Sequence, residues 1–494
     1  MEEEKKNECV IIEIPEDLKN WSDCVIYRVP RKLRKVNESS FTPQLLSIGP
    51  FHHGRNELKG MEPHKEKYLE DFCKRTDKTK QDLVNFVSHH STEILASYAG
   101  TVELTHQVFD QMILRDSCFI LELLCLFSDK GCQYHDQDDY LLKTPWLRNV
   151  VQLDLVIFEN QIPFSFLNKF YAFAKPRHEH TVGSLRLKSY CCPDSEECYC
   201  INSCIHFIKG VLSFKSSCCV CSKKSPEDHI SSSSRSSSSS DDSTLLDIAY
   251  NFFINFSSVH VKGKNDGIKE IKHFTDLVRQ FWLSKEFRRE ERRGCPFREH
   301  EKYLYSATKL NKAGVKFAPS ANKQAKFVEF NTIEKPLFNF IPFLHSLKVE
   351  LPTFEIQGNT ETLMRNVIAL EQCVYPDKAY ICNYVALMSQ LVDTAEDIEF
   401  LVEKRIIKNM LGSNKEVAEL VNKLTYKITE SNFVYANKCR QLNRFYETRF
   451  NIVRATLKRV YFNDLWTGSS TVLGICILMF SVSSTIKTLF FSKD

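Results

Sequence analysis

Apolar residues recur at helical spacing through much of the first 175 residues. After a short extended segment, Val25–Val29, apolar side chains lie three and four positions apart in Pro63–Lys74 and again in Phe109–Phe127. This spacing predicts two helices that each bury one face. A third apolar run, Leu153–Phe173, is interrupted at Pro163. The first half of the chain is therefore predicted to be mainly helical.

The pattern changes briefly in the C-terminal half, where short β-branched and aromatic segments lie between Pro and Gly residues. Such segments are typical of strands bounded by turns. We predict a small antiparallel β element there. Its strands are Val315–Phe317, Lys326–Phe330, Leu347–Leu351 and Thr353–Ile356.

Helical spacing then resumes. Tyr384–Leu411 is predicted to be one helix that ends at Gly412, which suits a helix C-cap. Ser413 and Glu416 have the spacing of a capping box and predict the start of the next helix. The last helix before the C-terminal apolar run is predicted to present Leu442, Tyr446, Phe450, Val453, Leu457 and Val460 on one face.

An uncharged, largely apolar run, Leu465–Ile486, lies between Asp464 and Lys487. Its twenty-two residues make a helix of about 33 Å, enough to cross a hydrocarbon core of about 30 Å. The centre, Val472–Val482, suits lipid, and hydroxyl groups in the flanks can bond to the helix's own carbonyl groups. We predict one transmembrane helix from Leu465 to Ile486, with a buried core helix as the alternative.

Charges on either side of this run predict its orientation. Six basic residues crowd the approach to the run and two follow it, and an excess of Lys and Arg marks the cytoplasmic side. The acidic start, Met1–Glu8, lacks the features of a secretory signal. We expect a single-pass, tail-anchored protein, in contact with membrane lipid, whose bulk is cytosolic. The preceding residues are Arg440, Arg444, Arg449, Arg454, Lys458 and Arg459, and those that follow are Lys487 and Lys493.

Composition adds little to this picture. The 494 residues are 43% hydrophobic and 26% charged, as in ordinary globular proteins, and the net charge is only +4. The locally basic segment Lys285–Arg293 is interleaved with Glu and suits a solvated helix face. We therefore expect no nucleic-acid partner.

Eight of the nineteen cysteines are concentrated between residues 191 and 221. Cys218 and Cys221 form a Cys-x-x-Cys pair that, with Cys200 and Cys204, has the donor types of a tetrahedral zinc site; His206 is a further candidate. A second regular pair is missing, and disulfides would need an oxidising compartment. We favour an irregular cysteine-rich loop and expect no cofactor. The eight residues are Cys191, Cys192, Cys198, Cys200, Cys204, Cys218, Cys219 and Cys221.

A serine-rich tract follows the cysteines and cannot bury enough apolar surface to order itself. We take residues 176–244 as a poorly ordered insertion between two folded halves. The predicted organisation is an N-terminal tail (1–24), a helical N-terminal half (25–175), the insertion (176–244), a helical C-terminal half with a small β element (245–464), the transmembrane helix (465–486) and a short tail (487–494).

Several distinctive motifs are spread over most of the chain: Tyr27–Pro30 (YRVP), Phe41–Gly54 (FTPQLLSIGPFHHG), Met61–Lys65 (MEPHK), Met112–Glu122 (MILRDSCFILE), Leu153–Pro163 (LDLVIFENQIP), Ala313–Phe317 (AGVKF), Arg365–Cys373 (RNVIALEQC) and the C-terminal run. In sequence and in order they resemble the plant-specific family catalogued as domain of unknown function 247. The resemblance implies a mainly α-helical, membrane-associated plant protein and supplies no established chemistry.

None of the phosphate-binding, dinucleotide-binding, zinc-protease or nucleophile-elbow motifs occurs in the sequence. The best catalytic candidates are His52 and His53 as a base or metal ligand, with Glu159 or Glu371 as a carboxylate partner. The plainer interpretation, which we favour, is that these groups and other polar residues of the motifs hydrogen-bond buried backbone. The others are Glu62, His64, Asp116, Glu122, Asp154, Asn160, Gln161 and Gln372.

Two functional classes follow. We favour a non-enzymatic interaction or recognition module, tethered by its C-terminal span and facing unidentified protein partners. The alternative is an enzyme with a novel His/carboxylate site, which would require His52, His53, Glu159 and Glu371 to converge. A weaker hypothesis is an ectodomain. It rests on three Asn-x-Ser sequons, which begin at Asn20, Asn37 and Asn255.

Overall fold

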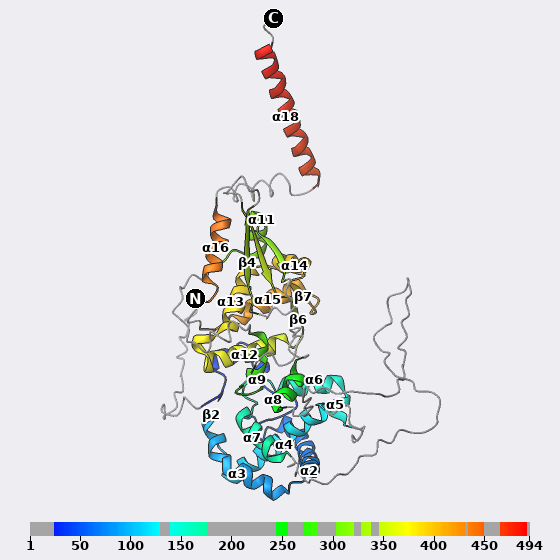
Figure 1. Ribbon diagram of the computed structural model, residues 1–494, viewed down its shortest axis with the longest axis vertical. Coiled ribbons are helices and arrows are strands. Elements are labelled where there is room, and N and C mark those ends of the chain that lie inside the picture. Colours follow the sequence, from blue (N-terminus) through cyan, green and yellow to red (C-terminus); the bar gives the residue numbers. More distant parts are fainter. Residues whose placement is uncertain are drawn as a thin grey trace, which may run out of the picture. The chain divides into compact units, whose positions relative to one another are not determined.

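The structure is a computed structural model of the 494-residue chain (Figure 1). It describes residues 24–128, 139–175, 244–254, 268, 270–283, 303–320, 328–336, 345–429, 433–448 and 465–491. The chain divides into two units, Met1–Pro176 with Ser243–Asp494 and Arg177–Asp242, and all described residues belong to the first. The predicted N-terminal tail, the insertion and the apolar face from Phe450 to Val460 lie outside the described residues, apart from the edges of the first two.

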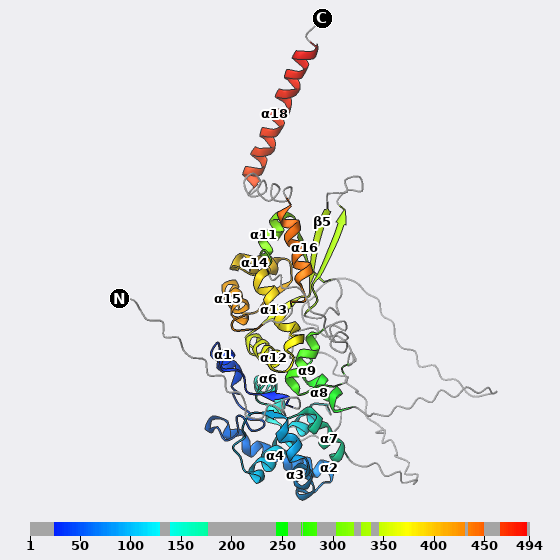
Figure 2. The ribbon, with the colours of Figure 1, turned by 90° about the vertical axis from the view of Figure 1, so that its left-hand side faces the viewer.

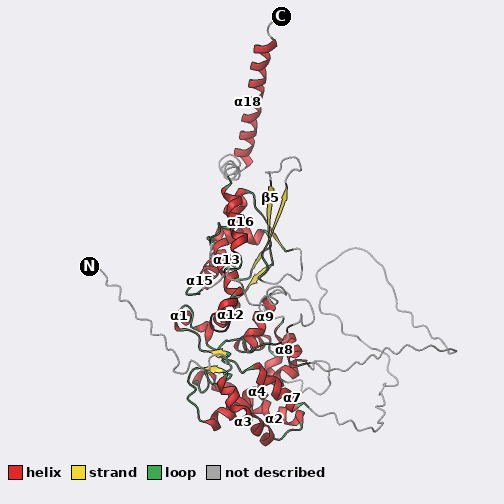
Figure 3. Cartoon of the chain, turned by 60° about the vertical axis from the view of Figure 1, so that its left-hand side comes forward, coloured by secondary structure: helices red, strands yellow, loops and turns green. Residues whose placement is uncertain are grey.

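Helices predominate among the described residues (Figure 3). Those of the N-terminal half are α1 (Arg31–Arg34), α2 (Glu62–Thr76), α3 (Lys80–Ala96), α4 (His106–Ser128), α5 (Tyr140–Lys143), α6 (Pro145–Asp154) and α7 (Phe164–Ala174), with the 3-10 helices η2 (Ser39–Phe41) and η3 (Asn56–Met61). Those after the insertion are α8 (Leu245–Phe253), α9 (Phe274–Trp282), α11 (Ala307–Ala313), α12 (Thr360–Val374), α13 (Tyr380–Leu391), α14 (Ala395–Glu403), α15 (Asn414–Leu424), α16 (Ala436–Glu447) and α18 (Leu465–Phe491), with η4 (Pro376–Lys378). The predicted mainly α class is confirmed.

Helix α4 is the centre of the N-terminal half. It packs against α2, α3, α7 and α8 (Figure 1). Its residues from Met112 to Cys125 are almost all buried. A helix enclosed on several sides needs apolar residues all round, which is why its sequence is so continuously hydrophobic. The predictions for α2 and α4 are confirmed to within a few residues.

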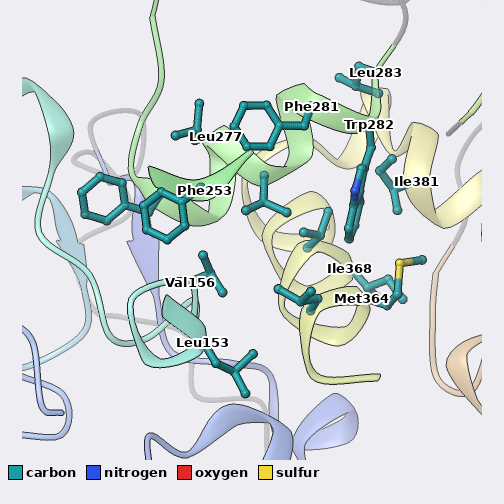
Figure 4. Close-up of a cluster of buried hydrophobic side chains, with 14 of the residues drawn as sticks. Leu153, Val156, Phe253, Leu277, Phe281, Trp282, Leu283, Met364, Ile368 and Ile381 are labelled. Carbon is teal, nitrogen blue, oxygen red and sulfur yellow. The ribbon is translucent and has the colours of Figure 1, made fainter. Parts of the chain in front are cut away.

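One hydrophobic core joins segments from both sides of the insertion. Figure 4 shows Leu153 at the end of α6 and Val156 just after it in the same cluster as Leu277 of α9 and Ile368 of α12. Trp282, at the end of α9, is 2% exposed and belongs to this core. The described residues of the two predicted halves therefore share a core.

The β structure of the described residues is divided among three small sheets and is more mixed in strand direction than predicted. The strands are β1 (Ile26–Tyr27), β2 (Tyr98–Ala99), β3 (Lys316–Pro319), β4 (Asn331–Pro336), β5 (His345–Leu351), β6 (Phe354–Ile356) and β7 (Ile407–Asn409). The three-stranded sheet has the order β3-β5-β4; β4 is antiparallel to β5, as predicted, but β3 is parallel to it. The strand predicted at Lys326–Phe330 is wrong in place, because β4 begins only at Asn331.

The helix predicted at Tyr384–Leu411 is two helices and a strand. Thr394 and Asp397 form a capping box that starts α14 and separates it from α13. After α14, β7 pairs in parallel with β6, so β6 is not part of the three-stranded sheet. Gly412 has a left-handed φ of +90°, but it lies in the turn after β7 and does not cap a helix. Helices α12 and α13 pack with α15, and α14 also contacts α15 (Figure 2).

Helix α18 begins at the predicted residue, Leu465, and continues to Phe491. Its segment Ser469–Ile486 is long and apolar enough to cross a membrane, and none of it is buried in the structure. Phe480 is 78% exposed and Leu478 is 65% exposed. A soluble core helix would bury such residues.

Candidate functional site

Segment Thr42–His53 carries one of the most distinctive motifs, and its backbone is held by side chains from other parts of the chain. The Asp154 carboxylate, at the end of α6, accepts hydrogen bonds from the backbone N–H groups of Gln44, Leu45 and Leu46 at 2.7–2.9 Å. Burial raises the pKa of Asp154 to about 6, against the opposing effect of these donors. Asp154 thus supplies the acceptors that a strand partner would otherwise provide.

Asn160 extends the same arrangement. Its Oδ1 accepts from the N–H of Ile48 at 2.7 Å, and its Nδ2 donates to the carbonyl groups of Leu46 and Asp154. The neighbouring Gln161 donates to the carbonyl groups of Leu155 and Ile157 and accepts from the N–H of Phe274. Both amide side chains are buried and hydrogen-bonded through both of their polar atoms.

Gly49 meets the central helix. Its N–H donates to Asp116 Oδ2 at 2.8 Å, while Asp116 Oδ1 lies 2.7 Å from the ammonium group of Lys65. Lys65 also binds Glu62 and the carbonyl group of Ser47. Burial raises the pKa of Asp116 despite the Lys65 charge. Burial alone would lower the pKa of Lys65, but Asp116 and Glu62 outweigh it and raise that pKa.

Glu159 anchors the N-terminal segment. Its Oε1 accepts from the N–H of Val29, and its Oε2 lies 2.6 Å from Arg34 and 3.4 Å from His52 Nε2. Burial would raise the pKa of Glu159, but His52, Arg34 and Val29 outweigh it and lower that pKa. Burial lowers the pKa of His52 more than Glu159 raises it. The pair is therefore a neutral imidazole beside an ionised carboxylate at neutral pH.

Glu371 lies in a separate network on α12. It is fully buried, lies 2.8 Å from Arg279 Nε of α9, and accepts from the N–H groups of Ile381 and Cys382 at the start of α13. Burial raises the pKa of Glu371, although Arg279 opposes this effect. Arg279 also donates to the carbonyl group of Lys378. This carboxylate ties three helices together.

The structure therefore brings together two of the four catalytic candidates. His52 and Glu159 are in contact, and both are buried. Among the described residues, His53 makes no side-chain hydrogen bond or ion pair, and Glu371 has no partner in common with Glu159. Neither ring nitrogen of His52 has a hydrogen-bond partner in the described part of the chain, so the 3.4 Å approach to Glu159 is a contact without hydrogen-bond geometry.

The other polar residues of the motifs also have structural partners or are exposed. Glu122 of α4 binds Arg75 of α2 at 2.8 Å, and Gln372 exchanges hydrogen bonds with the backbone of Thr429. His64 is exposed. The expectation that Asp116 and Asp154 bond to buried backbone is met: both hold the irregular segment Gln44–Gly49, and Asp116 also links α4 to α2 through Lys65.

Sequence reasoning missed the partners Arg34, Lys65, Arg279 and Asn366. Asn366 of α12 accepts from the N–H of Phe158 and donates to the carbonyl group of Ser40, so it also positions backbone. Lys65 and Asn366 lie within the motifs, but which groups they bind can be seen only in the structure. A basic or amide residue within an apolar helical face does indicate from sequence that a buried polar partner is needed.

No metal site is present among the described residues, because no group of three or more His, Cys, Asp or Glu side chains there could hold an ion. The zinc candidates Cys200, Cys204, Cys218 and Cys221, with His206, lie outside the described part of the chain. That prediction therefore stays a prediction.

Comparisons with known proteins support the resemblance found in the motifs. The chain matches the model of a family described as plant protein of unknown function, DUF247, over residues 26–480. It is 24% identical to the UPF0481 protein At3g47200 of Arabidopsis thaliana, over 95% of this chain and 87% of that protein. It is 23% identical to the putative UPF0481 protein At3g02645 of the same plant, over 95% of this chain and 90% of that protein. No solved structure matches the chain.

Proposed function

The chain belongs to DUF247, a family of plant proteins of unknown function, and we propose that it is a non-enzymatic interaction module anchored in a membrane by α18. The observation that carries this proposal is the exposure of an apolar helix. Val472, Leu473, Ile477, Met479 and Phe480 are each 51–78% exposed, and no described element covers them. A hydrocarbon core removes such a surface from water at about 25 cal/mol for each Å².

The length of α18 also suits a span. Its 27 residues extend about 40 Å at 1.5 Å per residue, more than a hydrocarbon core of about 30 Å requires. Thr485 Oγ1 donates to the carbonyl group of Ser481 within the helix, so the hydrogen bond of this hydroxyl group is satisfied inside a lipid bilayer.

The distribution of charge supports a cytosolic domain. Six Lys and Arg residues lie between residues 440 and 459, against Lys487 and Lys493 after the apolar segment. The described sequon agrees with this orientation. Asn37 Nδ2 donates to Glu361 Oε1 at 2.8 Å, and a glycan attached to that nitrogen would compete with this hydrogen bond. Asn20 and Asn255 lie outside the described residues.

The polar residues of the motifs support an interaction role over a catalytic one. Side-chain oxygen atoms of four of these residues accept hydrogen bonds from backbone N–H groups and so stabilise the fold: Asp116, Asp154, Asn160 and Glu371. The His52–Glu159 contact is the observation that favours the enzymatic alternative. Its burial argues against access by a substrate, and we assign it to the anchoring of the N-terminal segment.

Charge placed in the middle of α18 tests the anchor. The double substitution Leu478→Arg/Met479→Arg adds two charges at exposed positions of the full chain, each costing about 3 kcal/mol at a bilayer centre. We expect this variant to leave the membrane fraction on alkaline washing. The matched Leu478→Ala/Met479→Ala variant should stay in that fraction. Retention of the Arg variant, or release of the unaltered chain, would overturn the proposal.

A further inference from the structure

Three tyrosine rings form a cluster at the C-terminal end of α16. The ring centroids of Tyr303 and Tyr305 are 5.0 Å apart in an edge-to-face arrangement, and those of Tyr305 and Tyr446 are 4.0 Å apart. Tyr305 Oη also donates to Glu447 Oε1 at 3.2 Å. Tyr303 is 59% exposed.

The backbone that carries the exposed ring is held by a side chain of α16. Asn443 Nδ2, on α16, donates to the carbonyl group of Tyr303 at 2.7 Å, and Asn443 Oδ1 accepts from the N–H of Tyr305. Asn443 itself is buried. Leaving an aromatic ring in water forgoes its burial. An exposed Tyr303 ring that packs edge-to-face on Tyr305, on a hydrogen-bonded backbone, therefore points to a contact outside the described chain.

The chain length limits how far this cluster lies from the anchor. Tyr446 is nineteen residues before Leu465, where α18 begins. The connection from Thr448 to Leu465 spans at most about 60 Å even when fully extended. The surface next to the start of a short tether is the one that meets the bilayer most readily.

The side chains around the cluster suit a layer of lipid headgroups. Tyrosine is enriched at the membrane–water interface, where its ring lies among the headgroups and its hydroxyl stays in water. Arg444, which follows Asn443 and is exposed, supplies a donor for phosphate. Glu447 carries the opposite charge, and Tyr305 donates to it.

We propose that Tyr303 and Arg444 contact the phospholipid headgroups of the membrane that holds α18, so that this end of the domain lies on the bilayer. The inference rests on the proposed function, because it requires α18 to be the anchor. It adds an orientation: the surface that carries Tyr303 is turned toward lipid and is unavailable to protein partners.

Photo-crosslinking in the full chain tests this contact. The aromatic photo-reactive amino acid p-benzoylphenylalanine replaces Tyr303 in one variant and Arg444 in a second, and the protein is reconstituted in phosphatidylcholine vesicles with one-fifth phosphatidylserine. The matched control carries the same amino acid in place of Tyr426, whose exposure of 57% equals that of Tyr303 within a few per cent. After illumination, mass spectrometry measures peptides that carry a phospholipid, and an alkaline wash of the same vesicles reports anchoring.

We expect at least five-fold more lipid adduct from positions 303 and 444 than from position 426. Equal labelling at the three positions, or crosslinks from position 303 to a second copy of the chain, would overturn the inference. An absence of lipid adducts in protein that resists the alkaline wash would overturn the inference and leave the anchor intact. Release of the protein by the wash would overturn the anchor and the inference together.

Discussion

The ammonium group of Lys65 lies 2.7 Å from the carboxylate of Asp116, and both side chains are 1–2% exposed. This pair connects α2 to α4, and Asp116 also holds the backbone of Gly49. Replacing Lys65 by Met leaves a buried carboxylate without its countercharge. We expect Lys65→Met to lower the free energy of unfolding by about 3–5 kcal/mol, as for other broken buried pairs. Urea unfolding of the full chain in detergent, followed by circular dichroism, measures the loss.

The double variant Lys65→Met/Asp116→Asn is the control for this pair. It removes both charges and keeps an oxygen acceptor for Gly49, so it should be more stable than Lys65→Met alone. A Lys65→Met protein as stable as the unaltered one would contradict the account, because the pair would then contribute nothing to the fold.

Gly49 and Gly54 offer a matched pair of glycine substitutions. Both have a left-handed φ, +71° and +78°, so alanine at either position carries a backbone cost of about 1–2 kcal/mol. A Cβ atom on Gly49 would lie 2.6 Å from the carbonyl oxygen of Gln161 and 2.9 Å from Tyr98 Oη, whereas nothing lies within 4 Å of one on Gly54. We expect Gly49→Ala to be the more destabilising by about 1–3 kcal/mol in the same unfolding experiment. Equal losses would show that the contact at Gly49 is not tight.

His273 makes stability depend on pH. Burial lowers its pKa to about 3, while an unfolded imidazole has a pKa near 6.5. Below pH 6.5 the unfolded chain therefore binds a proton that the folded chain does not, so stability falls as the pH falls from about 6.5 toward 3. One pH unit below 6.5, this contribution amounts to about 1.4 kcal/mol.

Comparison of the unaltered chain with His273→Gln isolates this effect. The glutamine side chain can still donate to the carbonyl group of Val25, as His273 Nε2 does. The variant should lose about 1.4 kcal/mol less than the unaltered chain between pH 7.5 and 5.5. Asp154, whose pKa burial raises to about 6, acts in the opposite direction and cancels in the comparison. The exposed His106, replaced by Gln, is the surface control. Parallel pH profiles for all three proteins would contradict the prediction.

The sequence predicted elements whose causes are local. The apolar spacing in Phe109–Phe127 located α4, and the Ser413 side chain accepts from the N–H of Glu416, which is one of the two hydrogen bonds of the predicted capping box. A capping box at Thr394 and Asp397 divides the long apolar pattern into α13 and α14, and apolar spacing alone does not reveal this boundary. Element types thus follow from spacing, whereas a boundary inside a continuous apolar pattern depends on the cap.

The site could not be predicted in the same way, because its contacts join distant parts of the chain. Asp154 binds backbone 108–110 residues earlier, and Asn366 binds the N–H of Phe158 from 208 residues away. A buried carboxylate signals that a partner is needed, but not which one. The separation of Glu371 from Glu159 likewise depends on α12, which presents Glu371 to α9 and α13.

Membrane topology tests the central claim most directly. A glycan acceptor site is added after Asp494 of the full chain, and an endoglycosidase-sensitive mass shift is measured in a membrane-translocation system. Insertion of α18 with a cytosolic domain predicts modification of the added site alone, with Asn37 unmodified in its hydrogen bond to Glu361. Modification at Asn20, Asn37 or Asn255 would place the domain on the other side of the membrane. No modification, in protein that an alkaline wash releases, would show that α18 is not an anchor.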